Sequence, residues 1–212
     1  MSGRSAIETL REAGLHALVL GGFSMVAAAL LAGGNLLTAD EIKQRAAEDL
    51  QASLSQVIPP GIHDNSLLAD AITIPTAGGD VTVYRAVKDS AVTGVAYEVA
   101  GAGYAGAVRL ILGIDSGGRI LGVRTVKHNE TPGLGDKIET SKSDWITRFT
   151  GLSLGQPPED QWKVKKDGGR FDQFSGATIT PRAVVAAIRD GLAFFATHKD
   201  RLLSRATAET TR

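Results

Sequence analysis

The chain has 212 residues and carries 23 basic and 23 acidic side chains, so its formal net charge is zero. That balance argues against nucleic acid as a partner, because phosphate binding requires a basic excess or a basic patch. The chain has no cysteine and only four scattered histidines, which excludes disulfides and iron–sulfur clusters held by this chain and predicts no metal site.

The first predicted element is a membrane span. Residues 13–39 contain no Asp, Glu, Lys or Arg, and about 20 apolar residues cross a bilayer as a helix. The alternative is a cleavable signal peptide, whose apolar region is shorter (~7–15 residues) and ends in an A-x-A-like site. Here the alanines at 27–29 lie inside the apolar run, so we predict a retained span. Basic residues flank it almost equally on both sides, so charge leaves its orientation open.

A second helix is expected after the span. Thr38 and Glu41 have the spacing of a capping box, apolar residues then recur at helical spacing up to Val57, and Pro59-Pro60-Gly61 ends the pattern. We therefore divide the chain into an N-terminal tail and span (1–37), a juxtamembrane helix and linker (38–61) and a globular domain (62–212).

Residues 68–128 have the composition of strands. Four segments rich in Val, Ile and Tyr occur at 80–88, 93–100, 105–115 and 119–128. The turns between them are so short that neighbouring strands must be antiparallel. The predicted fold class is therefore α+β, with a single N-terminal transmembrane helix followed by a globular domain whose antiparallel sheet is flanked by helices.

The C-terminal third predicts three further elements. A short helix is expected between Ser143 as its cap and Gly151 as its stop, and a strand at 162–166. A long helix is expected from Pro181 to about Leu203, with Thr180 as its N-cap. Its inward stripe consists of Val184, Ile188, Gly191, Leu192 and Phe195.

Motifs for independent catalysis are missing from the sequence, and we predict no catalytic residue. Residues 101–106 spell G-x-G-x-x-G, but the segment after them has a strand pattern, so we interpret the glycines as a hairpin turn and not as a dinucleotide site. Asp115, Glu130 and Asp136 lie near loops and are interpreted as solvated loop acids.

Two loops remain as candidate binding features. Residues 128–135 combine small residues with a stiff proline, so their backbone can approach a flat ligand, although an ordinary turn is the alternative. Residues 175–178, Ser-Gly-Ala-Thr, precede a helix N-terminus, whose free N–H groups and partial positive charge favour phosphate. The alternative there is a simple capped helix start.

These loops resemble known signatures. Residues 172–178, Asp-Gln-Phe-Ser-Gly-Ala-Thr, resemble the D-x-x-[ST]-G-A-T motif, at which a flavin transferase takes FMN from FAD and links it by a phosphodiester bond to the last threonine. Residues 128–135 and 103–108 resemble two further signatures of the same FMN-binding domain family. The order of the signatures, the leading span and the ending of the chain most resemble the family of G subunits of the Rnf ion-translocating electron-transport complex.

The resemblance implies an electron relay through covalent FMN attached to Thr178. Tyr104 is expected to form a wall of the site, Lys163 or Lys165 to neutralise negative charge, and Asp172 with Ser175 to be recognised by the transferase. The expected phosphate contacts are Gly176, Ala177, Ile179 and Thr180, and Ser175 is counted among the cofactor-binding residues as well. The expected flanks of the isoalloxazine or ribityl chain are Glu130, Thr131, Pro132, Gly133, Leu134 and Gly135.

The resemblance also implies partners and a location. The partners are the other subunits of the membrane complex, the flavin transferase and membrane lipid, and the reaction belongs to the complex and not to this chain alone. The chain is expected to cross the bacterial inner membrane once, with its N-terminus in the cytoplasm and the FMN domain in the periplasm. The alternatives are the C subunit of the Na⁺-translocating NADH:quinone reductase and a membrane-anchored flavin-binding sensor or regulator.

Overall fold

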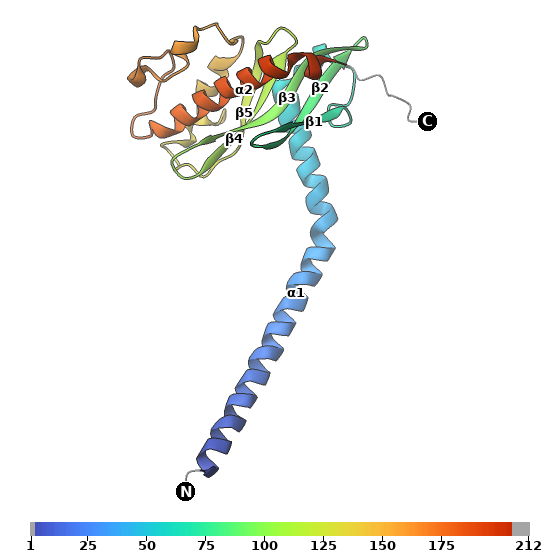
Figure 1. Cartoon of the computed structure of the whole chain (residues 1–212), viewed down its shortest axis with the longest axis vertical. Coiled ribbons are helices and arrows are strands. Elements are labelled where there is room, and N and C mark those ends of the chain that lie inside the picture. The colour runs from blue at the N-terminus through green and yellow to red at the C-terminus, as the bar shows by residue number, and fades with distance from the viewer. Residues whose placement is uncertain (1–2, 205–212) are drawn as a thin grey trace. The chain divides into compact units, whose positions relative to one another are not determined.

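The structure, a computed structural model, describes residues 3–204, and among side chains it describes 13, 14 and 16–204. The chain divides into two compact units between Asp49 and Leu50. The first helix, α1 (Gly3–Val57), is continuous (Figure 1). The predicted helix start at Thr38 is therefore wrong. The Thr38 hydroxyl donates to the Gly34 carbonyl at 2.9 Å, one turn earlier in the same helix, as a threonine inside a helix does.

One stretch of α1, His16–Val57, is long and apolar enough to cross a membrane. Its large apolar side chains are exposed between residues 18 and 37, which is costly in water and favourable in lipid. The most exposed of them include Leu18, Leu20, Phe23, Met25, Leu30, Leu31, Leu36 and Leu37.

The second unit is built on one five-stranded sheet. Its strands are β1 (Ala71–Thr76), β2 (Gly79–Lys88), β3 (Ala91–Ala102), β4 (Ala107–Asp115) and β5 (Ile120–Lys127). They lie in chain order and each pairs antiparallel with the next, which confirms the predicted meander. The G-x-G-x-x-G segment forms the β3–β4 hairpin turn, in which the Gly103 N–H donates to the Gly106 carbonyl at 2.8 Å.

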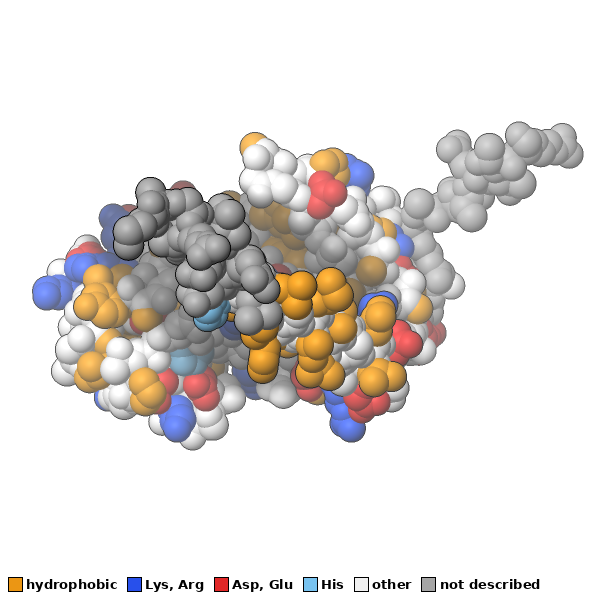
Figure 2. Space-filling model, turned by 90° about the horizontal axis from the view of Figure 1, so that it is seen from below, with side chains coloured by type: hydrophobic (Ala, Val, Ile, Leu, Met, Phe, Trp, Pro, Cys, Tyr) orange, Lys and Arg blue, Asp and Glu red, His pale blue; other side chains and the backbone are white. Residues whose placement is uncertain are grey.

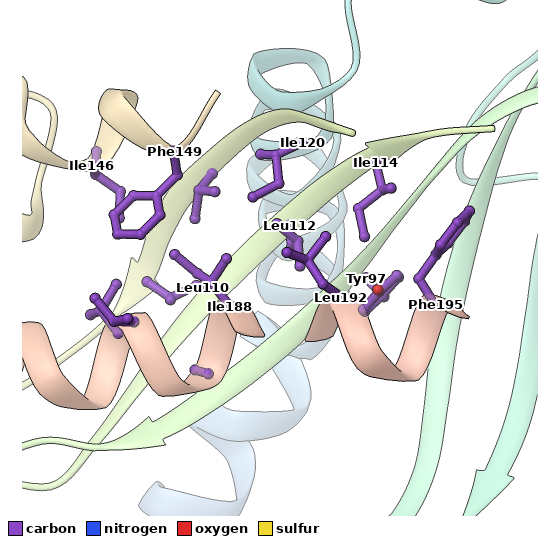
Figure 3. Close-up of a cluster of buried hydrophobic side chains, with 14 of the residues drawn as sticks. Tyr97, Leu110, Leu112, Ile114, Ile120, Ile146, Phe149, Ile188, Leu192 and Phe195 are labelled. Atoms are coloured by element: carbon purple, nitrogen blue, oxygen red, sulfur yellow. The ribbon is translucent and has the colours of Figure 1, made fainter. Parts of the chain in front are cut away.

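The long C-terminal helix, α2 (Ile179–Leu203), covers one face of the sheet. Figure 3 shows Ile188 and Leu192 of α2 meeting Leu110 and Leu112 of β4. All members of the predicted stripe are buried, so the helical spacing identified this face correctly. Glycine allows the close approach, because a Cβ at Gly191 would lie 2.7 Å from Leu112 Cδ2.

The last turns of α1 cover the other face. Leu54 and Val57 are buried there against Ile111 in a second apolar cluster. A Cβ at Gly113 of β4 would lie 2.4 Å from the Val57 carbonyl oxygen, so a glycine is needed for the helix to rest on the strand. The sheet is therefore covered on both faces, as an antiparallel sheet between helices must be to bury its apolar side chains.

Short 3₁₀ elements occupy the connections outside the sheet and the two long helices. They are η1 (Pro60–Ile62), η2 (Asp136–Ile138), η3 (Trp145–Phe149), η4 (Glu159–Gln161) and η5 (Lys165–Asp167). The predicted helix between Ser143 and Gly151 is η3, whose N-cap is Asp144 and not Ser143, although the Ser143 hydroxyl accepts the Trp145 N–H at 3.1 Å. The predicted strand at 162–166 is wrong. Val164 makes an isolated bridge to Phe171, and the chain enters the 3₁₀ turn η5 at Lys165, so no strand forms there.

Charged side chains of both signs share the surface. On the face drawn in Figure 2, Lys and Arg side chains are interspersed with Asp and Glu. Ion pairs such as Arg109–Glu98, at 3.2 Å, join neighbouring strands. This mixture agrees with the net charge of zero and provides no single-sign surface on that face for a polyanion.

Candidate functional site

A cavity of about 640 Å³ lies where three loops meet at the start of α2. Its volume falls within the ~300–1,000 Å³ typical of small-molecule sites. Its lining consists of Tyr104, Glu130, Thr131, Leu134, Gly135, Lys166, Gly176, Ala177, Thr178, Ile179 and Thr180. Ten of these were expected from the sequence. Four other expected residues do not line the cavity, namely Ser175, Pro132, Gly133 and Lys165.

The first cavity loop, residues 128–135, contains a tight turn. The N–H groups of Leu134 and Gly135 both donate to the Thr131 carbonyl at 3.1 Å. Pro132 stands at the second position of this turn, and Gly133 at the third has φ +79°, which is the pattern of a type II turn. The turn places Leu134 on the cavity wall and keeps Pro132 and Gly133 at the outer tip.

The second cavity loop, residues 174–178, contains a turn of the same kind. The Ala177 N–H donates to the Phe174 carbonyl at 3.1 Å, and Gly176 at the third position has φ +80°. Phe174 is buried and its ring meets that of Trp145 edge to face, with centroids 5.1 Å apart. Ser175 is exposed at the tip, so the turn is fixed at its apolar base and open at its polar end.

Glu130 connects the loops through a buried carboxylate. Only 5% of the residue is exposed. Its Oε1 accepts the Ala105 N–H of the hairpin turn at 3.0 Å, and its Oε2 accepts the hydroxyl of Thr180 in α2. The interpretation of Glu130 as a solvated loop acid is therefore wrong, and Asp136 is buried as well.

Two glycines make room for this carboxylate. A Cβ at Gly103 would lie 2.6 Å from Glu130 Oε1, and a Cβ at Gly135 would lie 2.9 Å from both Glu130 Oε2 and Thr180 Oγ1. Contacts this short are repulsive, so any side chain at either position would push the carboxylate out. These two glycines, which the sequence analysis assigned to turns, therefore also make the space in which the Glu130 carboxylate is buried.

Electrostatics keeps Glu130 ionised. Burial by itself would raise the pKa of this carboxyl, but hydrogen bonds from the Thr180 hydroxyl and from the Ala105 and Tyr104 amides lower it by more. The net pKa lies below the ordinary value of a glutamate. An ionised, fully hydrogen-bonded carboxylate thus ties the hairpin turn, the first cavity loop and α2 together.

The start of α2 differs from the prediction. The helix begins at Ile179, Pro181 is its third residue, and Thr178 occupies the N-cap position. Thr180 is therefore not the N-cap, because its hydroxyl is used by Glu130. Thr178 makes no side-chain capping bond. Its half-buried hydroxyl lines the cavity beside the first N–H groups of the helix, which attract an anion.

The lysines take different roles from those expected. Lys165 Nζ pairs with the Asp172 carboxylate at 2.6 Å, and Arg148 pairs with the same carboxylate at 2.9 Å. The hydrogen bond from Lys165 lowers the pKa of Asp172 below its ordinary value. Lys166, one residue further along, lines the cavity instead. No sequence signal distinguishes Lys163, Lys165 and Lys166, because the 3₁₀ turn that separates them was not predicted.

Three large apolar side chains remain exposed around the cavity. The exposed fractions are 73% for Tyr104, 44% for Ile179 and 43% for Leu134. Such side chains cover a flat aromatic group well, while the helix start and Lys166 suit a negative charge. The cavity can therefore hold a molecule with an aromatic part and an anionic part.

Comparison with known proteins gives the following matches. Residues 103–193 match the FMN-binding domain family and residues 10–57 match the RnfG N-terminal region. The chain is 52% identical to the G subunit of an ion-translocating oxidoreductase complex from Cereibacter sphaeroides, over 88% of this chain and 86% of the relative. It is 47% identical to a protein of the same name from Stutzerimonas stutzeri, over 89% and 83%. A crystal structure of NqrC from Shewanella oneidensis aligns with a TM-score of 0.47 and 24% identity, over 71% of this chain and 73% of that chain.

Proposed function

Because the chain belongs to the family of G subunits of ion-translocating oxidoreductase complexes, we propose that it carries FMN covalently on Thr178. The chain is a membrane-anchored electron-transfer subunit with an FMN-binding domain, and it works together with the other subunits of its complex. The observation that carries the proposal is the Thr178 hydroxyl, which lines the cavity at the N-cap position of α2 without a capping bond of its own.

The residues of the cavity fit FMN. A phosphate on Thr178 would meet the first N–H groups of α2, and Lys166 would add positive charge to the same cavity. The apolar side chains of Tyr104, Leu134 and Ile179 would cover the aromatic ring. When bound, the flavin supplies the redox chemistry, and the protein supplies attachment, position and electrostatics.

The attachment is a phosphoryl transfer without any change of oxidation state. Thr178 Oγ1 forms a bond to the phosphorus of the FMN half of FAD, the bond from that phosphorus to the AMP half breaks, and AMP leaves. The hydroxyl proton passes to the flavin transferase. Thr178 lies next to a turn whose tip, Ser175 and Gly176, is exposed, so a transferase has room to approach this hydroxyl.

The flavin domain would lie in the periplasm and the N-terminus in the cytoplasm. The flanking basic residues leave this orientation open, so it rests on the resemblance of the chain to its family. A covalent tether suits an exported domain, because free FMN lost outside the cytoplasm would not be replaced. Membrane lipid around α1 and the flavin transferase complete the proposed partners.

The alternative assignment to the C subunit of the sodium-translocating quinone reductase is not favoured. The relatives above are named as G subunits and cover most of both chains. The sensor alternative has no specific observation in its favour.

Two threonines of the same cavity provide the test. The full chain is produced together with a flavin transferase, denatured in SDS and examined for flavin fluorescence in the gel. We expect fluorescence from the wild type and from Thr131→Val, which removes an exposed hydroxyl from the same cavity. We expect none from Thr178→Val. Fluorescence of the denatured Thr178→Val chain would contradict the proposal.

A further inference from the structure

We propose that His128 positions the first cavity loop, residues 128–135, and that it does so only as a neutral ring whose proton is on Nε2. The backbone N–H of Glu130 donates to His128 Nδ1 at 3.1 Å. On the other side of the ring, His128 Nε2 lies 2.8 Å from Glu139 Oε1. The ring therefore connects the beginning of the loop with the segment that follows η2.

The backbone donor determines which ring nitrogen carries the proton. The N–H of Glu130 is always a donor, so Nδ1 must offer its lone pair and cannot be protonated. In a neutral ring the proton is then on Nε2, where the Glu139 carboxylate accepts it. The hydrogen bond from His128 in turn lowers the pKa of Glu139, and Ser141 adds a second bond to the same carboxylate. Both ring nitrogens are thus satisfied in one tautomer.

A second proton on the ring breaks this arrangement. Protonated Nδ1–H would face the Glu130 N–H, so two donors would meet where one hydrogen bond stood. Only 13% of the His128 side chain is exposed, which leaves little water to take over either donor. The protonated ring therefore keeps its contact with Glu139 and gives up its contact with the loop.

Charged side chains of both signs surround the His128 ring. The carboxylates of Glu139 and Glu130 lie near the ring, and Arg124 and Lys127 of β5 line a second cavity with His128. Lys142 acts on Glu139 from the far side. The geometry at Nδ1 decides what protonation does to the loop, because the Glu130 N–H needs an acceptor there.

Release of the Glu130 N–H reaches the cavity by a short path. The carboxylate of Glu130 stays tied to α2 and the hairpin turn, and its backbone leads directly into the turn at Thr131 that sets Leu134 on the cavity wall. Loss of the His128 contact therefore loosens the entry to this turn. The presence of a flavin beside the first cavity loop rests on the proposed function. The coupling between the His128 ring and this loop is independent of that function.

Hydrogen exchange on the full chain in detergent, without attached flavin, tests the coupling. The amides of residues 130–135 are compared at ~pH 5 and ~pH 8, on either side of the ordinary histidine value of ~6.5, after correction for intrinsic exchange. His128→Asn retains an oxygen that accepts the N–H two residues on, as in an Asx-turn, but does not titrate. His128→Leu removes the acceptor altogether. His198→Asn serves as the control, because this histidine lies on α2 and makes its hydrogen bond and its ring contact with Phe194 of the same helix.

We expect wild type and His198→Asn to lose protection at ~pH 5 by about three- to ten-fold, the size of one backbone hydrogen bond. His128→Asn should keep the same protection at both pH values, and His128→Leu should show low protection at both. In addition, ¹⁵N-histidine spectra of the wild type at ~pH 8 should show Nε2–H and unprotonated Nδ1. Equal wild-type protection at both pH values, or a proton on Nδ1 at ~pH 8, would overturn the proposal. Neither result bears on whether Thr178 carries FMN, which the gel experiment decides separately.

Discussion

The two loops that face the cavity use the same turn but are held by opposite kinds of contact. Each has a glycine with positive φ at the third position of its turn, Gly133 in the first loop and Gly176 in the second. The first loop is anchored by the buried carboxylate of Glu130. The second is anchored by the buried ring of Phe174, packed on Trp145.

This difference suggests a division of roles, in which the first loop is held rigid and the second remains accessible to other molecules. A buried carboxylate with several hydrogen bonds fixes the orientation of its loop, but only while the carboxylate is ionised. A buried aromatic ring holds a turn by packing and leaves the polar groups of the turn unused. In the second loop, Ser175 is exposed and the Thr178 hydroxyl makes no capping hydrogen bond within the described part of the chain, so neither hydroxyl is needed to hold the turn. We infer that the first loop shapes the site and that the second presents the residue to be modified.

The largest effect should come from removing the carboxylate anchor. In Glu130→Ala, the buried Thr180 hydroxyl and the Ala105 N–H lose their acceptor, and each unsatisfied donor costs ~1–3 kcal/mol. We expect the globular unit to lose about 3 kcal/mol of unfolding free energy, measured by urea denaturation. Glu159→Ala, at an exposed acid of η4, is the control and should change stability by no more than ~0.5 kcal/mol. If Glu130→Ala lost no more unfolding free energy than the control, the Glu130 carboxylate would not be an anchor.

Alanine at the two turn glycines should separate stability from modification. Gly133→Ala and Gly176→Ala each place a side chain in a left-handed conformation, which costs ~1–2 kcal/mol. We expect similar losses of stability in both. Only Gly176→Ala, two residues before the proposed attachment residue Thr178, should also slow flavin attachment, measured as flavin fluorescence gained per unit time with purified transferase and FAD. Equal attachment rates in the two variants would remove the distinction between the loops.

The carboxylate anchor should also make stability depend on acid. Because the folded-state pKa of Glu130 is lowered, its stabilisation is fully present above its ordinary value of ~4.3 and is lost as pH falls through the lower, folded value. Between ~pH 5 and ~pH 3 the melting temperature of the wild type should therefore fall more steeply than that of Glu130→Gln. The lowered pKa values of Asp172 and Glu139 are common to both chains and cancel. Parallel curves would contradict the assignment.

The smallest effect on stability should come from Asp172, the first residue of the segment that resembles a flavinylation motif. Asp172 pairs with Lys165 and Arg148 but is 44% exposed, so Asp172→Asn should cost less than ~1 kcal/mol. We propose that it nevertheless slows attachment, because the two ion pairs orient the backbone that leads into the second loop. Asp167→Asn, which breaks the neighbouring ion pair with Arg182, is the matched control. An unchanged attachment rate in Asp172→Asn would contradict a role in modification.

The sequence predicted what depends on periodicity and short spacing. Strand alternation with short turns led to the meander, and the stripe from Val184 to Phe195 identified the buried face of α2. The missed features depend on contacts between distant segments. The break expected at Thr38 failed because a threonine in a helix bonds its own preceding turn just as readily as it caps a new one.

The site was predicted only in part for the same reason. The resemblance to known signatures named most of the cavity lining, but nothing local shows that Glu130 is buried under Thr180, 50 residues away. Nor does any local pattern show that Lys166, and not Lys165, lines the cavity, because the two lysines are consecutive residues of the 3₁₀ turn η5, which the sequence did not predict. The burial of Glu130 and the contacts of the two lysines arise only when distant segments pack together, so no single segment predicts them.

The most direct test of the central claim is the mass of one peptide. Trypsin releases residues 171–182, which contain Ser175, Thr178 and Thr180. From chain produced with the transferase, this peptide should carry the added mass of FMN less one water, and fragmentation should place it on Thr178. An unmodified peptide under these conditions, or an FMN mass placed on Ser175 or Thr180, would contradict the account.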